Sequence, residues 1–439
     1  MSLLAAGCEI RRTSAARLTV PASTTAISAS SCRKLGYLIH YNPYEYHAEI
    51  NDFDFLPRFP KLGNNLMEIK VDAEVIVVGG AVVGSALAYG IAKLGKRVLV
   101  LDGQDQDMRA ARANFGLVWT QGKGANAPAY QELTGQSSDL WPDFVQELTE
   151  SADVRVDYSR PGGLVYCLSE TEYENREALN KRTHNYLSAS DLRMIDRSEL
   201  ERMMPAVAFG PEVVGASYCK ADGHVNPLQL LAALQRGVIA HGGKILFRNT
   251  VQSITPNADG FTVTAALGSY KAPCVIVAAG HATPPLTDPL GFKIPLKADR
   301  GQLLVTERIE PLLPYPGSGL RQTSDGTVMI GATKENVTDR GVTVASATKL
   351  ALRATRIIPA LASARLVRQW SGFRVLPPDG TPIYAQSEEF PGLFAAACHS
   401  GVTLAAAHAA IVAPAMIEGR LLSDLSAFSN GRFDVQKCA

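Results

Sequence analysis

The stretch Glu74-Val-Ile-Val-Val-Gly-Gly-Ala-Val-Val-Gly84 decides the fold that this sequence predicts. Its first half is a short β-branched run, which is typical of a buried parallel strand. Gly79 and Gly84 fill the first and third glycine positions of G-x-G-x-x-G, and Ala81 fills the second. Between a strand and a helix, such a turn lets the backbone approach a pyrophosphate at the helix N-terminus. The pattern therefore predicts a dinucleotide site.

The residues that follow this turn complete a β-α-β unit. Apolar residues recur at helical spacing from Val83 to Leu94, and Gly95 ends the predicted helix. A second short strand covers residues 98–101. Asp102 follows it, at the position where an acid accepts hydrogen bonds from the adenosine ribose. The register of this acid strengthens the prediction of a dinucleotide site.

The composition excludes several other kinds of protein. The chain has 439 residues, of which 46% are hydrophobic and 19% charged, with a formal net charge of +1. Because no block of like charges occurs, we expect no nucleic-acid partner. The seven cysteines are scattered and never spaced C-x-x-C, so we expect no disulfide framework, no metal site and a reducing, cytoplasmic location. Residues 75–92 and 394–417 are long uncharged runs, but Gly, Ala and Ser dominate them, and we expect no membrane span.

The first 66 residues differ from the rest of the chain. Residues 10–34 are rich in Arg, Ser, Thr and Ala and contain no acid, which is typical of a transit peptide. The alternative, which we favour, is that the natural start is Met67, just before the first strand. In either case we expect residues 1–66 to form a poorly ordered extension.

Further motifs follow the β-α-β unit in order along the chain. They are Arg112-Ala-Asn-Phe-Gly-Leu-Val-Trp119, Asp222-Gly-His-Val-Asn-Pro227, Val277-Ala-Ala-Gly280, Arg300-Gly-Gln302, Trp370-Ser-Gly-Phe-Arg374, Pro378-Asp-Gly-Thr-Pro382 and Cys398-His-Ser-Gly-Val-Thr403. Through these motifs the sequence resembles the D-amino acid oxidase superfamily of FAD-dependent oxidoreductases from about residue 73 to 420. Residues 114–119 and the stretch Gln121-Gly-Lys-Gly124 are most similar to the flavin subunits of opine oxidase and hydrogen cyanide synthase, and glycine oxidase is a more distant relative.

The resemblance implies an α/β fold, in which a Rossmann-like FAD-binding domain carries an inserted α+β substrate domain with a mixed antiparallel sheet. It also implies non-covalent FAD, because the sequence has no cysteine near Gly372 and no histidine in 110–116, where some relatives attach the flavin. The expected parts are 67–150, 222–292 and 372–439 for the FAD-binding domain with its C-terminal tail, and 151–221 and 293–371 for the substrate domain.

The same resemblance assigns roles to individual residues. Arg374 is expected to bind a substrate carboxylate through two parallel hydrogen bonds, and the alternative is a structural ion pair. An apolar, buried helix is expected from about Thr403, with its N-terminus facing the flavin. His399 either contacts the flavin and acts in catalysis or is a packed or capping residue. The expected cofactor-binding residues are Gly79, Gly80, Ala81, Val82, Val83, Gly84, Asp102, Arg112, Asn114, Phe115, Gly116, Val251, Ala279, Gly280, Gly372, His399, Ser400, Gly401, Val402 and Thr403.

The function implied is oxidation of an amino acid or N-substituted amino acid, such as a D-amino acid, a glycine- or sarcosine-like substrate or an opine. Hydride transfer to FAD would give an imine, which hydrolyses to an oxo acid and an amine. Two alternatives stay open. The chain is either a flavin-carrying subunit of a multi-subunit, opine oxidase-type dehydrogenase that is inactive alone, or an FAD-dependent 2-hydroxy acid dehydrogenase. The expected partners are therefore a small-molecule substrate and, in the first alternative, other subunits.

Overall fold

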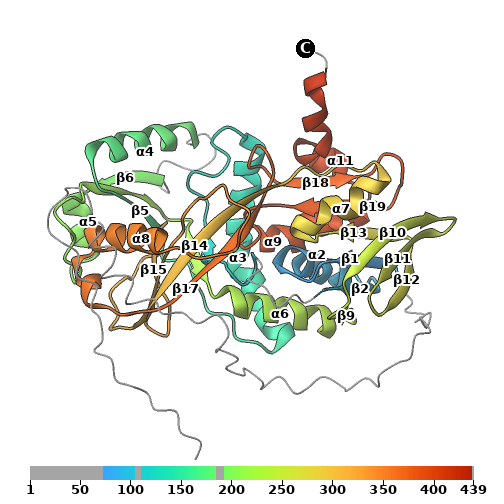
Figure 1. The fold of residues 1–439 in the computed structure, drawn as a ribbon, viewed down its shortest axis with the longest axis horizontal. Helices are drawn as coiled ribbons and strands as arrows, with labels where there is room; N and C mark the ends of the chain where they lie inside the picture. The colour runs from blue at the N-terminus through green and yellow to red at the C-terminus, as the bar shows by residue number, and fades with distance from the viewer. Residues whose placement is uncertain (1–72, 104–109, 184–191, 438–439) are drawn as a thin grey trace, which may run out of the picture.

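The computed structural model describes residues 73–103, 110–183 and 192–437 (Figure 1). The extension predicted over residues 1–66, and residues 67–72 after it, lie outside the described residues. Figure 1 shows a mostly parallel sheet with its helices on the right and antiparallel sheets with helices α4, α5 and α8 on the left. Two long strands run between these halves, namely β14 (Lys297–Arg308) and β17 (Leu366–Leu376).

The six-stranded sheet is built on the predicted β-α-β unit, and its strand order is β18-β19-β13-β1-β2-β9. All of its pairs are parallel except β18 with β19. A parallel sheet is covered on both faces, which explains why all four residues of β1 are buried. The elements are β1 (Val75–Val78), α2 (Val82–Lys93), β2 (Val98–Leu101), β9 (Lys244–Leu246), β13 (Cys274–Val277), β18 (Ile383–Gln386) and β19 (Leu393–Ala397).

The side chains of β1 alternate between two hydrophobic cores. Val75 and Val77 enter a core shared with α2 and other helices on one face of the sheet. Ile76 and Val78 enter a second core, formed with a three-stranded antiparallel sheet on the opposite face. The covering elements are α3 (Pro128–Ala152), α6 (Pro227–Ala240), β10 (Val251–Asn257), β11 (Gly260–Ala265), β12 (Gly268–Ala272) and α7 (Thr283–Thr287).

The other half of the molecule is antiparallel and has a core of its own. Its larger sheet has the order β15-β16-β14-β17, and a three-stranded sheet has the order β5-β7-β6. A small sheet, β3-β8-β4, completes the described strands. The remaining elements are β3 (Leu117–Val118), β4 (Tyr158–Ser159), β5 (Gly163–Cys167), α4 (Glu170–Thr183), β6 (Leu192–Asp196), α5 (Arg197–Met203), β7 (Gly215–Cys219), β8 (Gly223–Val225), β15 (Leu320–Gln322), β16 (Thr327–Gly331) and α8 (Val344–Ile357).

The C-terminal apolar run is buried within the protein. It forms β19 and then a helical segment in the core against α2. No described helix is both long enough and apolar enough to cross a membrane. The helical pieces are α9 (Ala405–Ala407), a π-helical turn (His408–Val412), α10 (Ala413–Ile417) and α11 (Leu421–Asp424), and 3₁₀ turns occur at Gly280–Ala282, Asp288–Leu290, Pro359–Ser363, Ser426–Phe428 and Asn430–Lys437.

The helix predicted from Thr403 begins two residues later and is not a regular α-helix. The carbonyl of Thr403, which would accept a bond from Ala407 in an α-helix, accepts hydrogen bonds from Ser137 and Trp141 of α3 instead. The backbone N–H of Ala407 donates to the hydroxyl of Ser137 at 3.2 Å. Side chains inserted into the helical ladder are a recognised cause of such irregularity.

Candidate active site

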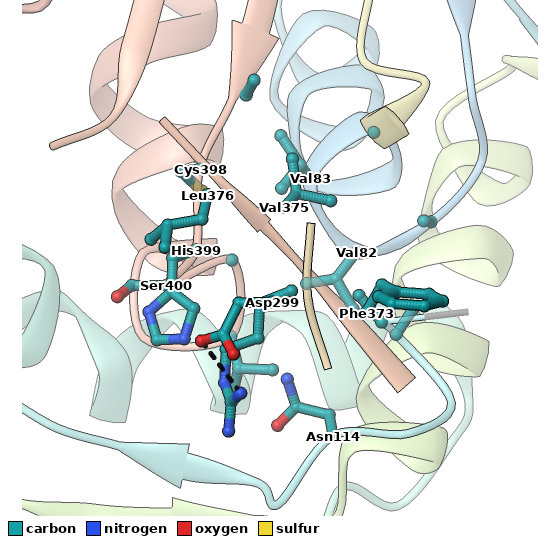
Figure 2. Close-up of a pocket in the computed structure, with 18 of the residues that line it drawn as sticks. Val82, Val83, Asn114, Asp299, Phe373, Val375, Leu376, Cys398, His399 and Ser400 are labelled. Carbon is teal, nitrogen blue, oxygen red and sulfur yellow. Dashed lines mark hydrogen bonds and ion pairs between the residues drawn. The ribbon is translucent and has the colours of Figure 1, made fainter. Parts of the chain in front are cut away.

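A cavity of about 1320 Å³ lies between the two halves of the molecule. Figure 2 shows Val82 and Val83 at the start of α2, and His399 and Ser400 after β19, around this cavity, together with Asp299 of β14. Pockets for a single drug-sized ligand are usually about 300–1,000 Å³. The volume is therefore sufficient for a dinucleotide and a small substrate together.

One end of the cavity is formed by the turn before α2, and two of its positions require glycine. Gly79 has φ +103°, and a Cβ added there would lie 2.6 Å from the carbonyl oxygen of Ala278. A Cβ on Gly84 would lie 1.9 Å from the carbonyl oxygen of Gly79. Helix α2 has no side-chain cap and no acid in its first turn, so its N-terminal N–H groups are available to an anion. These features fit a bound pyrophosphate.

Ala81 and Asp102 also belong to this end. Ala81 has φ −77° and ψ −174°, an extended conformation that any residue adopts, so its methyl group introduces no strain. One oxygen of Asp102 accepts a hydrogen bond from the backbone N–H of Gly80 at 2.6 Å. Asp102 therefore supports the turn, and it lines the cavity as well.

Most of the predicted site residues lie in the wall of this cavity, including Val251, which comes from β10. The exceptions are Gly80, Gly84, Arg112 and Gly116. Gly80 and Gly84 belong to the turn but do not line the cavity. Gly116 has φ +82°, and a Cβ added there would lie 2.4 Å from the carbonyl oxygen of Val225. Arg112 is exposed outside the wall. Direct contact of these residues with the cofactor stays a prediction.

Arg374 lines the cavity from strand β17, in the antiparallel half of the molecule, and this part of the wall is called the Arg374 end. It pairs with Asp299 of the neighbouring strand β14, with 3.1 Å between Nη1 and Oδ2. Its Nη2 donates to the carbonyl oxygen of Thr333 at 2.8 Å. The guanidinium packs over Gly301, where an added Cβ would lie 2.6 Å from Nη2. Arg374 thus makes a structural ion pair, which was the alternative role expected from the sequence, and it also lines the cavity.

His399 projects into the same part of the cavity, where its side chain is accessible although protein surrounds it. Desolvation and the nearby cations Lys123, Arg374 and Lys334 hold the pKa of His399 well below its usual value. The imidazole is therefore neutral at pH 7. A neutral ring is suited to hydrogen bonding with a substrate, but it does not supply a second positive charge.

Four charged or polar residues at this end were not predicted as site residues from the sequence: Lys123, Tyr130, Asp299 and Lys334. The hydroxyl of Ser400 accepts a hydrogen bond from Nζ of Lys123 at 2.7 Å and shares another with the hydroxyl of Tyr130 at 2.6 Å. The sequence signal for Lys123 was the stretch Gln121-Gly-Lys-Gly124, which served above only to choose among the relatives. Among the described residues, no group of three or more His, Cys, Asp or Glu side chains could hold a metal ion.

This arrangement defines a dinucleotide-binding α/β protein, and comparison with known proteins identifies its family. The model of the FAD dependent oxidoreductase (DAO) family matches residues 74–415. The chain is 41% identical to a subunit of the opine oxidase of Rhizobium meliloti over 373 residues, which cover 83% of this chain and 99% of that protein. It is 26% identical to the HcnC subunit of the hydrogen cyanide synthase of Pseudomonas aeruginosa, with 83% and 97% covered.

A solved structure agrees with these relatives. The glycine oxidase of Geobacillus kaustophilus superposes with a TM-score of 0.74 at 25% identity, over 81% of this chain and 98% of that one. The chain therefore belongs to the DAO family of FAD-dependent oxidoreductases, as its motifs predicted. The α/β FAD-binding fold and FAD as the cofactor are both confirmed. The turn of α2 and the size of the cavity fit this cofactor.

Proposed function

We propose that this enzyme oxidises an amino acid or an N-substituted amino acid at the carbon that bears the nitrogen. Bound FAD would supply the redox chemistry by accepting a hydride from that carbon. The nitrogen would release a proton to give the imine, which water hydrolyses to an oxo acid and an amine. The observation that carries the proposal is the position of Arg374, which lines the same cavity as the dinucleotide-binding turn of α2.

Arg374 can hold a carboxylate while it keeps its present partners. A guanidinium has five N–H donors, and the contacts with Asp299 and Thr333 each use one. These two contacts fix the plane of the guanidinium, so the remaining donors meet a substrate carboxylate in a defined orientation. Two parallel hydrogen bonds would align the Cα–H bond for transfer. The neutral His399 ring can accept a hydrogen bond from the substrate nitrogen.

The names of the relatives favour a second candidate function. The opine oxidase relative, at 41% identity, is one subunit of its enzyme, and HcnC is also a subunit of a larger enzyme. In this alternative the chain carries flavin within a multi-subunit dehydrogenase and is inactive alone. Both candidates share the cavity and Arg374, and they differ in whether the purified chain turns over.

The two candidates are separated by anaerobic mixing of the FAD-loaded full chain with glycine, sarcosine, proline, D-amino acids and opines. We expect bleaching of the flavin absorbance by at least one amine, with ammonia or an amine among the products. Bleaching by 2-hydroxy acids alone would instead support the 2-hydroxy acid dehydrogenase alternative. No bleaching by any of these compounds would contradict the proposal and favour the multi-subunit alternative.

The role of Arg374 is tested by the variant Arg374→Lys, which keeps a positive charge beside Asp299 but removes the two-point contact. We expect kcat/KM to fall by about 100-fold, because a charge-assisted hydrogen bond contributes about 1.5–3 kcal/mol. The control is Arg368→Lys on the same strand, where the exposed guanidinium lies 5.5 Å from the Trp370 ring, outside the cavity. A loss below threefold for Arg374→Lys would contradict its role as carboxylate ligand.

A further inference from the structure

Oxidation at a carbon that bears an amino group requires a group that accepts a proton. In water at neutral pH the nitrogen is an ammonium, since α-amino groups have pKa values of about 8. The nitrogen must lose a proton before its lone pair can form the C=N bond of the imine. A general base works best when its own pKa lies near the operating pH. The base is therefore expected among the titratable side chains that line the Arg374 end of the cavity.

Asp299 and two histidines are unsuited to this role. Both oxygens of Asp299 are in use, because Oδ2 pairs with Arg374 at 3.1 Å and Oδ1 accepts from the backbone N–H of Glu335 at 3.0 Å. His281 and His399 also line the cavity. Desolvation lowers the pKa of His281 and holds that of His399 well below its usual value. A proton taken from an ammonium would not stay on either ring.

Tyr130, Cys398 and Lys334 are unsuited for other reasons. Burial raises the pKa of Cys398 to about 12 and raises that of Tyr130 as well. Both groups therefore keep their protons at neutral pH and cannot accept another. Lys334 is exposed, so water solvates its ammonium. Because an arginine does not release its proton in proteins, Lys123 is the side chain that remains among those described at this end.

The contacts of Lys123 place its amine in the cavity wall. Its Nζ donates to the hydroxyl of Ser400 at 2.7 Å, and that hydroxyl shares a second hydrogen bond with Tyr130 at 2.6 Å. In the described part of the chain, no carboxylate pairs with Lys123. The side chain lines the cavity and is partly accessible. A neutral lysine amine keeps two N–H bonds and one lone pair, so it can hold Ser400 and still present the lone pair to a ligand.

The loop that carries Lys123 is held on both sides. A Cβ on Gly124 would lie 2.4 Å from a backbone nitrogen of α3, so the loop is in contact with the start of that helix. On the other side, fully buried Asp222 accepts a hydrogen bond from the side-chain amide of Gln121 at 2.7 Å. Arg176 of α4 donates to the oxygen of the same amide at 2.7 Å. Tertiary contacts thus fix the amine in position, which is what a catalytic group requires.

The charges around Lys123 favour its neutral form. Burial lowers the pKa of Lys123 to about 8, because desolvation penalises the ammonium. The nearby Lys334 and Arg374 act in the same direction, whereas Cys398 and Asp222 act in the opposite direction. About a tenth of this lysine is therefore neutral at pH 7 and about half at pH 8. The match with an α-amino group lets a proton pass between the two nitrogens at little cost.

We propose that Lys123 is the catalytic base of the oxidation, whose neutral amine takes the proton from the substrate nitrogen while Arg374 holds the carboxylate. This inference rests on the proposed function and adds the acceptor of the proton. An N–H bond of the substrate ammonium breaks, and a new N–H bond forms on Lys123. The electron pair left on the nitrogen then forms the C=N bond as the hydride leaves Cα for FAD. Lys123 returns its proton to water after the product has left.

The test follows anaerobic flavin bleaching as a function of pH, with the FAD-loaded full chain. The amine of the panel above that bleaches fastest is used at saturation. We expect the wild-type rate to fall about tenfold per pH unit below about pH 8, as Lys123 gains its proton. In Lys123→Gln the rate at about pH 8 should fall at least about 100-fold, the usual contribution of a general base, and this limb should be lost. A limb retained near pH 8 in Lys123→Gln would overturn the proposal.

The variant Lys123→Arg separates the base from its charge. Arginine keeps the positive charge and can donate to Ser400, but it does not release a proton. We therefore expect Lys123→Arg to be as slow as Lys123→Gln. A rate for Lys123→Arg within about tenfold of the wild type would show that the charge is sufficient, and it would refute a role as base.

Two control variants leave the base in place. Lys334→Gln removes a neighbouring charge that lowers the pKa of Lys123, so the limb should remain and move to higher pH. Lys349→Gln, at an exposed position on α8, should leave both the rate and the limb unchanged. Loss of the limb in Lys334→Gln would assign the base to Lys334 and contradict the proposal.

A binding measurement keeps the test independent of turnover. The probe is 2-aminoisobutyrate, which has an ammonium and a carboxylate but no Cα–H bond to be oxidised. At about pH 7 its binding should release more than about half a proton in the wild type and almost none in Lys123→Gln, as calorimetry in two buffers of different ionisation enthalpy measures. If no amine bleaches the flavin but this release depends on Lys123, the proposed function fails and the proton-accepting role stands. Equal release in the two proteins, or none in the wild type, refutes the role of Lys123.

Discussion

The two ends of the cavity are built by different means. At the Gly79–Gly84 end, the contacts come from backbone N–H groups and from glycines that admit no side chain. At the Arg374 end, they come from charged side chains whose positions depend on partners such as Asp299 and Ser400. The first end lies within one short stretch of sequence, whereas the second joins segments that are far apart in the chain. The turn before α2 is therefore specified by local sequence, whereas the surroundings of Arg374 are specified by tertiary structure.

The largest effect is expected from Gly84→Ala, which changes only the Gly79–Gly84 end of the cavity. The added Cβ would lie 1.9 Å from a backbone oxygen of Gly79, which cannot move without opening the turn. We expect the Kd for FAD to rise at least about 1,000-fold, or about 4 kcal/mol. Quenching of flavin fluorescence measures this Kd, and circular dichroism checks that the chain is folded.

The control for this variant is Gly135→Ala in helix α3, where an added Cβ meets nothing within 4 Å. Alanine is the better helix former by about 1 kcal/mol, so this variant should bind FAD normally and unfold no earlier. If folded Gly84→Ala keeps its FAD affinity within tenfold, the turn is not the phosphate site, and the contrast between the two ends is lost.

An intermediate effect is expected from Asp222→Asn, which changes the loop that carries Lys123 at the Arg374 end of the cavity. The new amide places an N–H₂ group opposite either the donors of Thr120 or the donor of Gln121. We expect the free energy of unfolding to fall by about 2 kcal/mol, the usual cost of a buried unsatisfied group. Chemical denaturation measures the loss.

FAD content should be retained in Asp222→Asn, because the described hydrogen bonds of Asp222 go to Thr120 and Gln121 and not to the turn of α2. The matched control is Asp139→Asn, since Asp139 makes an exposed ion pair with Arg160 at 3.0 Å. Exposed pairs contribute about 0–1 kcal/mol, so little change is expected there. Loss of FAD from Asp222→Asn at full stability would show that the two ends are not independent.

The smallest effect is expected from Ala81→Gly, which restores the usual residue of the phosphate-binding motif. Because Ala81 is already in an extended conformation, glycine has no strain to relieve. We expect the Kd for FAD to change less than about threefold, and stability to fall by up to about 1 kcal/mol through the greater freedom of the unfolded chain. Titration with FAD and thermal unfolding measure the two quantities. A tenfold gain in affinity would show that the methyl group obstructs the pyrophosphate.

The Gly79–Gly84 end could be predicted well from the sequence, because the strand, the glycine motif and the helix that form it are adjacent in the chain. The second strand was predicted over the residues that form β2, and the first within one residue of β1. The family and the FAD-binding fold followed from motifs of the same kind and are confirmed. The domain boundaries, together with the roles of Arg374 and His399, stay predictions.

The Arg374 end could not be predicted as well from the sequence, because its contacts join residues that are far apart in the chain. The pair of Arg374 with Asp299 depends on the register of β14 and β17, in which these two residues lie opposite each other. The charged environment of Lys123 depends on Lys334 and Ser400, which reach it only in the folded chain. The irregular helix after Thr403 depends on Ser137, a residue of α3. None of these pairings leaves a periodic pattern in the sequence.

The close crossing of α2 with the C-terminal helical segment has a consequence for biosynthesis. A Cβ on Gly90 would lie 2.2 Å from the carbonyl oxygen of Ala409, so the two backbones are in direct contact. Ala409 is synthesised after α2, with every described strand except β1 and most of the described helices between them. Domains generally fold from the N-terminus during synthesis, but here the side of α2 that packs against residues 405–417 lacks its cover until that segment emerges. A nascent chain that stops before Cys398 has no such cover and lacks one wall of the cavity, so the cavity is completed only when this segment has been synthesised.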